Sequence, residues 1–134
     1  MITLSTKTKE LTTPQLRKIV WETLLYMKEN VGTKQKFSRL KYQVLTLPKG
    51  YTPAYGSYDP DTNSLVVYKN HAHDVKMVVR SVLHEYTHFL QNLRYYHLTL
   101  SKVGYNAHPL EKQARAMEHL YSECWKEIKR KVNC

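Results

Sequence analysis

The sequence predicts an α+β fold in which a small antiparallel or mixed sheet with a β-hairpin packs on three helices. Apolar residues recur with the 3.6-residue helical period in three segments, which begin near residues 13, 75 and 109. Two short β-prone runs flank a turn at residues 59–63, which is the pattern of a hairpin. The 134 residues suffice for one core, so we expect a single domain over residues 1–134.

The first helix is expected from Thr13 to Asn30. Thr13 is the expected N-cap, because its hydroxyl can accept a hydrogen bond from a free backbone N–H, and Pro14 suits the first turn. Gly32 follows the end of the helix. One face is apolar and carries Leu16, Val20, Leu24, Met27 and Val31. We interpret this segment as a packing helix.

The strands are expected between the first two helices. The first runs over Leu40–Leu47 and is closed by the turn at 48–50. The hairpin pairs residues 55–58 with Ser64–Tyr68 around the turn Asp59–Asn63, which is rich in turn-forming residues. Its second strand leads directly into the next helix.

The second helix carries the motif His-Glu-Tyr-Thr-His at residues 84–88. Asp74 is a suitable N-cap, and no Gly or Pro interrupts residues 75–103. At about 100° per residue, one face collects the apolar side chains Val75, Val78, Val79, Val82, Leu83, Tyr86, Phe89, Leu90 and Leu93. His84 and His88 lie roughly opposite this face. We therefore expect one side of the helix in the core and the imidazoles at a cleft.

The spacing of this motif is typical of a zinc site. Histidines at positions i and i+4 of a helix point in the same direction, because four residues nearly complete a turn. Both imidazoles can then bind one tetrahedral ion, and zinc prefers nitrogen ligands at about 2.0–2.1 Å. Glu85 can reach a water that zinc binds. The sequence thus predicts one Zn²⁺ per chain, held by His84 and His88, with Glu85 as the catalytic base of a hydrolase.

The third helix supplies the candidates for a third ligand. It is expected from Pro109 to about Val132, with an apolar stripe formed by Leu110, Ala114, Met117, Tyr121, Cys124, Trp125, Ile128 and Val132. Glu111 and Glu118 lie about two turns apart on one flank of this stripe, where a carboxylate can face a cleft shared with the second helix. Glu111 is the expected ligand, and His108 and Glu118 are the alternatives.

The H-E-x-x-H motif followed by Glu111-Lys-Gln-Ala114 resembles the zincin metallopeptidases and, among them, the gluzincins. In gluzincins a third ligand Glu lies on a later helix, often in an E-x-x-A or E-x-x-D setting. The resemblance covers about residues 40–120 and implies a minimal zincin core, like those of small bacterial and bacteriophage metallopeptidases, acting on a peptide or protein. It also implies that Leu65–Tyr68 pairs with an extended substrate by β-addition.

Two features depart from the gluzincin pattern. The Asp that follows the third ligand by four positions in thermolysin-like members is Arg115 here, so Glu118 is the candidate to hold a ligand histidine by its second nitrogen. No second lobe is evident, so we expect a shallow substrate cleft that depends on a partner.

The motif implies a mechanism of peptide hydrolysis. Glu85 would accept a proton as water attacks the peptide carbonyl, and would then deliver it to the leaving amine. A further group should stabilise the oxyanion, and the candidates near the site in sequence are Tyr105, His108 and Arg115.

The net charge of +10, from 21 Lys and Arg against 11 Asp and Glu, favours acidic partners. An acidic peptide or protein substrate is the first expectation, and nucleic acid is a secondary one. The alternative function is that of a basic nucleic-acid-binding or regulatory protein whose metal site is structural or vestigial. The sequence predicts no particular oligomeric state.

The sequence also bears on location. No apolar run reaches 18 residues, so no membrane span is expected. Residues 1–10 have no apolar segment after a basic one, so we expect no secretory signal and a cytoplasmic protein. Cys124 and Cys134 are then expected as free thiols.

Overall fold

The computed structural model describes residues 1–91, 104–105 and 108–134, and it confirms the α+β class. In chain order the elements are the 3₁₀ turn η1 (Thr8–Glu10), α1 (Thr13–Asn30), the 3₁₀ turn η2 (Gln35–Arg39), β1 (Lys41–Leu45), β2 (Gly56–Asp59), β3 (Ser64–Tyr68), α2 (Val75–Leu90), α4 (Pro109–Met117), the 3₁₀ turn η4 (Glu118–Leu120) and α5 (Tyr121–Val132).

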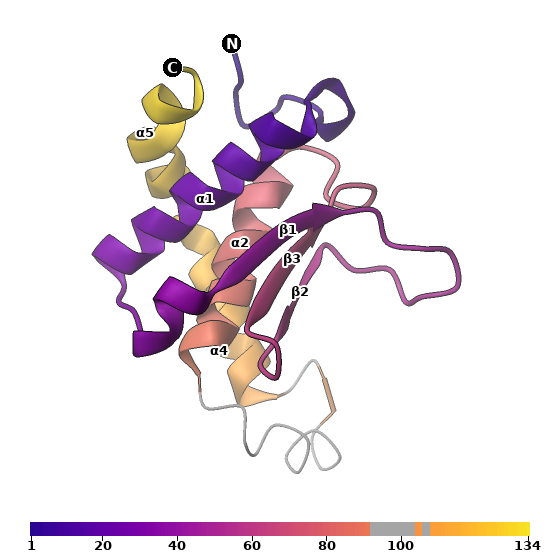
Figure 1. Cartoon of the computed structure of the whole chain (residues 1–134), viewed down its shortest axis with the longest axis vertical. Coiled ribbons are helices and arrows are strands. Elements are labelled where there is room, and N and C mark those ends of the chain that lie inside the picture. The colour runs from indigo at the N-terminus through magenta and orange to yellow at the C-terminus, as the bar shows by residue number, and fades with distance from the viewer. Residues whose placement is uncertain (92–103, 106–107) are drawn as a thin grey trace.

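These elements form three layers (Figure 1). The sheet packs against the pair α1 and α2, with β1 on α1 and with β2 and β3 on α2. On the far side of this pair, α4 packs against α2 and α5 packs against α1. The helix α2 is thus covered from both sides, by the sheet and by the C-terminal helices.

The sheet has the strand order β1-β3-β2, with β1 parallel and β2 antiparallel to β3. The predicted hairpin is confirmed, and the predicted first strand is shorter than expected. Leu65 and Val67 are fully buried against the helices. Because β3 has a strand on each side, its backbone is already paired, and the predicted pairing of Leu65–Tyr68 with a substrate is wrong.

The helix α1 has the predicted bounds, but its N-cap is Thr12 and not Thr13. The Thr12 hydroxyl accepts a hydrogen bond from the backbone N–H of Gln15 at 3.2 Å, and Gln15 Oε1 accepts one from the backbone N–H of Thr12 at 2.8 Å. This reciprocal pair is a capping box, which requires a Gln or Glu three positions after the cap. Only Thr12 has that spacing to Gln15.

The start of α2 is fixed by its cap and by the N-terminal segment. Asp74 is the N-cap as predicted, and its Oδ1 accepts from the backbone N–H of Met77 at 2.9 Å. The first two N–H groups of the helix donate to the carbonyls of Thr6 and Leu4. The free N–H groups at this helix end are therefore satisfied from two directions.

The end of α2 comes earlier than the apolar pattern suggests. The helix ends at Leu90, and Gln91 is extended, with φ −81° and ψ 156°. Leu93, which was predicted on the buried stripe, lies outside the described residues. The seven stripe residues from Val75 to Phe89 are buried as predicted.

The predicted C-terminal helix is interrupted in the middle. The chain passes through the 3₁₀ turn η4 between α4 and α5. No Gly or Pro marks this break in the sequence; it occurs where the chain changes its packing partner from α2 to α1. Ala114 of α4 and Trp125 of α5 are buried as predicted, so the apolar stripe persists across the break.

Other expectations can be compared with the described residues. None of the helices described is long and apolar enough to cross a membrane. Cys124 and Cys134 are both free, the first buried and the second exposed. Burial raises the pKa of the Cys124 thiol to about 12.

The capping box leads to a stability prediction. Thr12→Ala removes the side-chain acceptor of the box and should lower the free energy of unfolding by about 1 kcal/mol. Thr13→Ala is the matched control, because this exposed neighbour forms no cap, and it should change stability by less than about 0.5 kcal/mol. Denaturant unfolding of both variants measures the difference. Equal effects would contradict the assignment of Thr12 as the cap.

Candidate metal centre

Two helices bring the candidate residues together. His84, Glu85 and His88 all lie on α2. The two histidines face α4, which packs against α2, and Glu85 lies beside Gly56 of β2. Glu111 lies in the first turn of α4, and Glu118 begins the turn η4. The break after α4 therefore leaves both carboxylates facing α2.

The donor atoms of His84, His88 and Glu111 converge on one point. One oxygen, Oε1 of Glu111, lies 3.0 Å from His84 Nε2 and 2.9 Å from His88 Nε2. The two imidazole centroids are 5.0 Å apart. All three donor atoms lie within 4.8 Å of one another, so this group could hold a metal ion. Glu111 is the third member that the sequence predicts.

The donor distances fit a tetrahedral ion. Two donors bound at about 2.0–2.1 Å to such an ion are about 3.4 Å apart. The His–Glu contacts would need to lengthen by only about half an ångström to admit it. Glu111 is only 4% exposed, and a buried carboxylate needs cationic or hydrogen-bonding partners. The residues present therefore suit a divalent cation.

His84 is held between two carboxylates. Its Nδ1 lies 2.9 Å from Glu118 Oε2, while its Nε2 faces Glu111. Arg80, one turn earlier on α2, holds the other oxygen of Glu118 from Nε at 3.1 Å and from Nη2 at 3.0 Å. Because a carboxylate accepts, Nδ1–H donates to Glu118 and Nε2–H donates to Glu111. A metal ion would take the place of the Nε2 proton, while Glu118 would keep hold of Nδ1–H. This is the contact that the sequence analysis proposes for Glu118.

The charges around the site shift several pKa values. Burial works to lower the pKa of His84, but the carboxylates of Glu111 and Glu118 outweigh it and raise this pKa to about 9. The pKa of His88 is also raised, against the effect of its burial, by Glu111 and Glu85. Without a cation the site thus holds its carboxylates together through histidine protons. A metal ion would take the place of a proton between these groups.

Glu85 is buried beside the two histidines and is 8% exposed. Burial raises its pKa to about 7, against the lowering effect of His84 and His88. Burial also works to raise the pKa of Glu118, but His84 and Arg80 lower it below its ordinary value. The pKa values of Glu85 and Glu118 are therefore shifted in opposite directions, and Glu85 is the carboxyl group suited to exchange a proton near neutral pH.

Gly56 of β2 lies beside Glu85, but its lack of a side chain is required by the neighbouring strand. A Cβ built on Gly56 would lie 2.7 Å from the Val66 carbonyl oxygen of β3 and 3.4 Å from Cγ of Glu85. The first distance is too short for any side chain, whereas the second is an ordinary contact. Glycine at position 56 thus permits the pairing of β2 with β3, and this pairing places the sheet edge beside Glu85.

The site opens into a cleft of about 730 Å³ between the sheet edge, the start of α2 and α4. Its floor contains His84 and Glu85. The other polar and charged side chains on its walls are Tyr55, His71, His73, Arg80, Ser81, Tyr105, Arg115 and Glu118. Burial, followed by the charges of Glu111 and Glu85, raises the pKa of Tyr105, which is 56% exposed at this cleft. Of the oxyanion candidates, Tyr105 and Arg115 therefore line the cleft.

The third oxyanion candidate, His108, is placed elsewhere. It is buried as the N-cap of α4, where its Nδ1 accepts a hydrogen bond from the backbone N–H of Leu110 at 3.1 Å. It is neither a cleft residue nor part of the metal-binding group. One ring nitrogen of His108 is thus used to start α4, and its role at an oxyanion stays a prediction.

Three residues of the site were missed in the sequence. Arg80 precedes His84 by one helical turn, and this spacing could have identified it as a partner for Glu118. Gln91 follows His88 by three residues, and its Oε1 lies 2.8 Å from His88 Nδ1. Gly56 carries no local signal, since its role depends on the pairing of β2 with β3.

No family model, no curated protein sequence and no solved structure matches this chain. The resemblance to the gluzincins therefore depends on the motif residues and on their geometry.

The close approach at Gly56 can be tested by substitution. Gly56→Ala should lower the free energy of unfolding by about 1–3 kcal/mol, because β2 must shift to keep the methyl group away from the Val66 carbonyl oxygen. Ser57→Ala on the same strand removes only a half-buried hydrogen bond to Tyr68 and should cost less. Denaturant unfolding compares the two. A fully stable Gly56→Ala variant would show that β3 leaves room for a side chain at this position.

Proposed function

We propose that this protein is a zinc-dependent metallopeptidase of the gluzincin type. The observation that carries the proposal is the convergence of His84, His88 and Glu111 beside the buried carboxyl group of Glu85, with His84 and Glu85 lining an open cleft. A site that serves only the stability of the fold needs neither an acid–base group beside the ion nor access from solvent.

Zinc is the metal that this donor set suits best. Two imidazole nitrogens and one carboxylate oxygen form the three-ligand set of catalytic zinc sites, which keep a further position open. The bound ion would polarise the carbonyl group of a peptide and lower the pKa of a water molecule. One ion per chain is expected, since the three ligands belong to one chain.

Glu85 is the proposed general base. Its carboxyl group lies next to the ligands and is shielded from solvent, so its affinity for a proton is close to what reaction at neutral pH needs. Glu85 would take a proton from the attacking water and pass it to the amine that leaves. Its place between α2 and Gly56 restricts how far the side chain can swing.

Tyr105 and Arg115 are the proposed partners of the carbonyl oxygen. Both line the cleft that contains His84 and Glu85, and the charges of Glu85 and Glu111 act on the Tyr105 phenol. A phenol O–H or a guanidinium group can donate to an oxygen on which negative charge develops.

The proposed substrate is a peptide segment with acidic side chains. Arg115, His71 and His73 stand on the walls of the cleft, and the chain as a whole carries a charge of +10. The strand with an edge at this cleft is β2, since Gly56 and the residues just before it line the wall. An extended peptide can add to such an edge through its backbone.

Metal uptake is the first test of the proposal. The protein should bind one zinc ion, and His84→Ala, His88→Ala and Glu111→Gln should each weaken binding by more than about tenfold, because even a residue that only holds a ligand contributes about that much. Glu123→Gln on α5, an exposed carboxylate, is the control. Zinc binding is measured by competition with a chelator.

Two outcomes would contradict this assignment. One is a wild-type protein that takes up no zinc at micromolar concentration. The other is a Glu111→Gln variant that binds zinc at full affinity while Glu118→Gln or His108→Ala releases it. The second outcome would retain a two-histidine site but remove the gluzincin assignment.

Hydrolysis is the second test. Glu85→Gln should retain zinc and the fold but lose peptide hydrolysis, because the amide cannot accept a proton while the ligands are unchanged. The assay uses purified wild-type and variant proteins with acidic and basic peptides. Undiminished hydrolysis by the variant would assign the activity to another residue or to a contaminant. Zinc-dependent folding without any hydrolysis would indicate a structural metal and a regulatory protein.

A further inference from the structure

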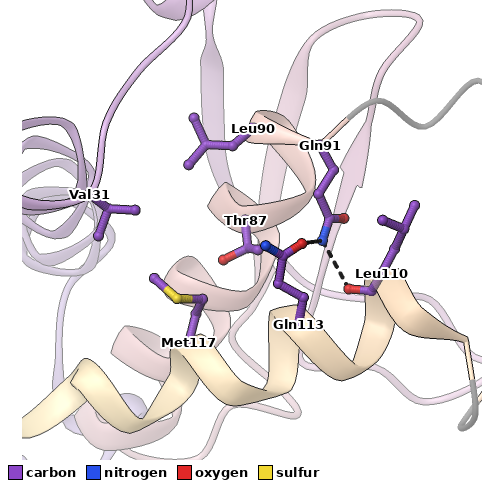
Figure 2. A pocket seen from close by; sticks show the side chains of 7 residues that line it. All are labelled: Val31, Thr87, Leu90, Gln91, Leu110, Gln113 and Met117. Carbon is purple, nitrogen blue, oxygen red and sulfur yellow. Dashed lines mark hydrogen bonds between the residues drawn. The ribbon is translucent and has the colours of Figure 1, made fainter.

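The side chain of Gln91 joins the end of α2 to the start of α4 (Figure 2). Its Nε2 donates to the backbone carbonyl of Leu110 at 3.0 Å and to Gln113 Oε1 at 2.7 Å. Its Oε1 lies 2.8 Å from Nδ1 of His88. Both ends of this one amide are therefore engaged, one on α4 and one on a metal-ligand candidate.

The partner on α4 fixes which way the amide points. A backbone carbonyl can only accept, so the NH₂ group of Gln91 must face Leu110 and its oxygen must face His88. His88 Nδ1 must then carry the hydrogen and donate it. The other ring nitrogen, Nε2, lies 2.9 Å from Glu111 Oε1 and donates to it; exchange of this proton for a metal ion would leave the Nε2 lone pair for the ion.

The same amide also sets the position of α4. The carbonyl of Leu110 belongs to the peptide bond that leads to Glu111, so Gln91 touches the ring of one candidate ligand and the backbone that carries another. Gln91 is itself held, because its N–H donates to the carbonyls of Thr87 and His88 and its own carbonyl accepts from Lys34 Nζ at 3.1 Å.

We propose that Gln91 is a positioning residue of the metal centre. It selects the His88 tautomer that leaves Nε2 for the ion, and it holds the backbone before Glu111 next to His88. For His88 it has the role that Glu118, supported by Arg80, has for His84. This inference rests on the metal site of the proposed function and is independent of peptide hydrolysis.

The surroundings of Gln91 allow an informative substitution. The amide borders a hollow of about 380 Å³, whose walls include the apolar side chains of Val31, Leu90 and Met117 (Figure 2). A leucine at position 91 can extend into this space without crowding. Gln91→Leu therefore removes the hydrogen bonds while it retains most of the side-chain volume.

The experiment compares zinc affinity and the state of the His88 ring. Gln91→Leu should lower zinc affinity by about 10- to 100-fold. In the zinc-loaded wild type, NMR of the imidazole nitrogens should show a slowly exchanging proton on His88 Nδ1, and this signal should be lost in the variant. Gln113→Ala is the matched control, since it leaves the contacts of Gln91 with His88 and Leu110 intact, and it should change affinity by no more than about twofold.

A second variant covers the case in which Gln91→Leu does not fold, as judged by circular dichroism. Gln91→Glu keeps an acceptor for His88 but loses the donors to α4, so it should retain the Nδ1 proton signal. Where Gln91→Leu also folds, Gln91→Glu should bind zinc more tightly than Gln91→Leu does.

The proposal is overturned if a folded Gln91→Leu variant binds zinc within about twofold of wild type. It is also overturned if His88 carries its hydrogen on Nε2, or if Gln91→Glu loses the Nδ1 proton. Zinc uptake without hydrolysis would remove only the peptidase function, whereas a wild type without zinc uptake would remove both.

Discussion

The architecture depends on a single buried oxygen, Oε1 of Glu111, which touches both imidazoles of the α2 motif. A carboxylate that is 4% exposed loses its hydration and must recover that free energy from its partners. The rings of His84 and His88 are those partners, so the first turn of α4 must lie over the middle of α2. A divalent cation at this point would strengthen the attachment, because it would bind all three groups at once.

The need of the buried Glu111 carboxylate for both imidazoles explains why α2 is buried on both sides. Its apolar face packs on the sheet and α1 in the ordinary way, whereas its opposite face is polar and still only slightly exposed, since Glu85 and His88 are 8% and 7% exposed. A polar face can be covered in this way only if its hydrogen bonds are completed by the element that covers it. Glu118 and Glu111 on the C-terminal segment are the partners of His84 and His88. Gln91, which donates to the carbonyl of Leu110 on the same segment, accepts from the second ring nitrogen of His88. The turn η4 then lets the chain leave α2 and continue along α1.

The sequence predicted the features that depend on local period and composition. The helical period placed His84 and His88 on one face and Glu111 and Glu118 on one flank, and the structure brings all four together. The hairpin followed from its turn residues. The role of Leu65–Tyr68 was mispredicted, because no local pattern reveals that β1 joins β3 from the other side.

Other features could not be predicted from the neighbouring sequence, because they depend on contacts between segments that are distant along the chain. Gly56 is explained by the close approach of the Val66 carbonyl in β3, and the break at η4 by the change of packing partner. His108 looked like a site residue from its type and position, yet it caps α4. Thr12 is different: the T-x-x-Q spacing of the capping box is present in the sequence and was overlooked.

The candidate metal site gathers acidic residues in a chain that is otherwise strongly basic. Glu85, Glu111 and Glu118 are three of only 11 acidic residues, and all three surround one point. With zinc bound, the two charges of the ion together with that of Arg80 would balance these carboxylates, so the centre as a unit would be close to neutral. The field in the cleft would then come mainly from the groups around it, among them Arg115 and the net charge of +10. Under the proposed peptidase function, the net positive charge around a nearly neutral centre would favour acidic peptide segments over basic ones.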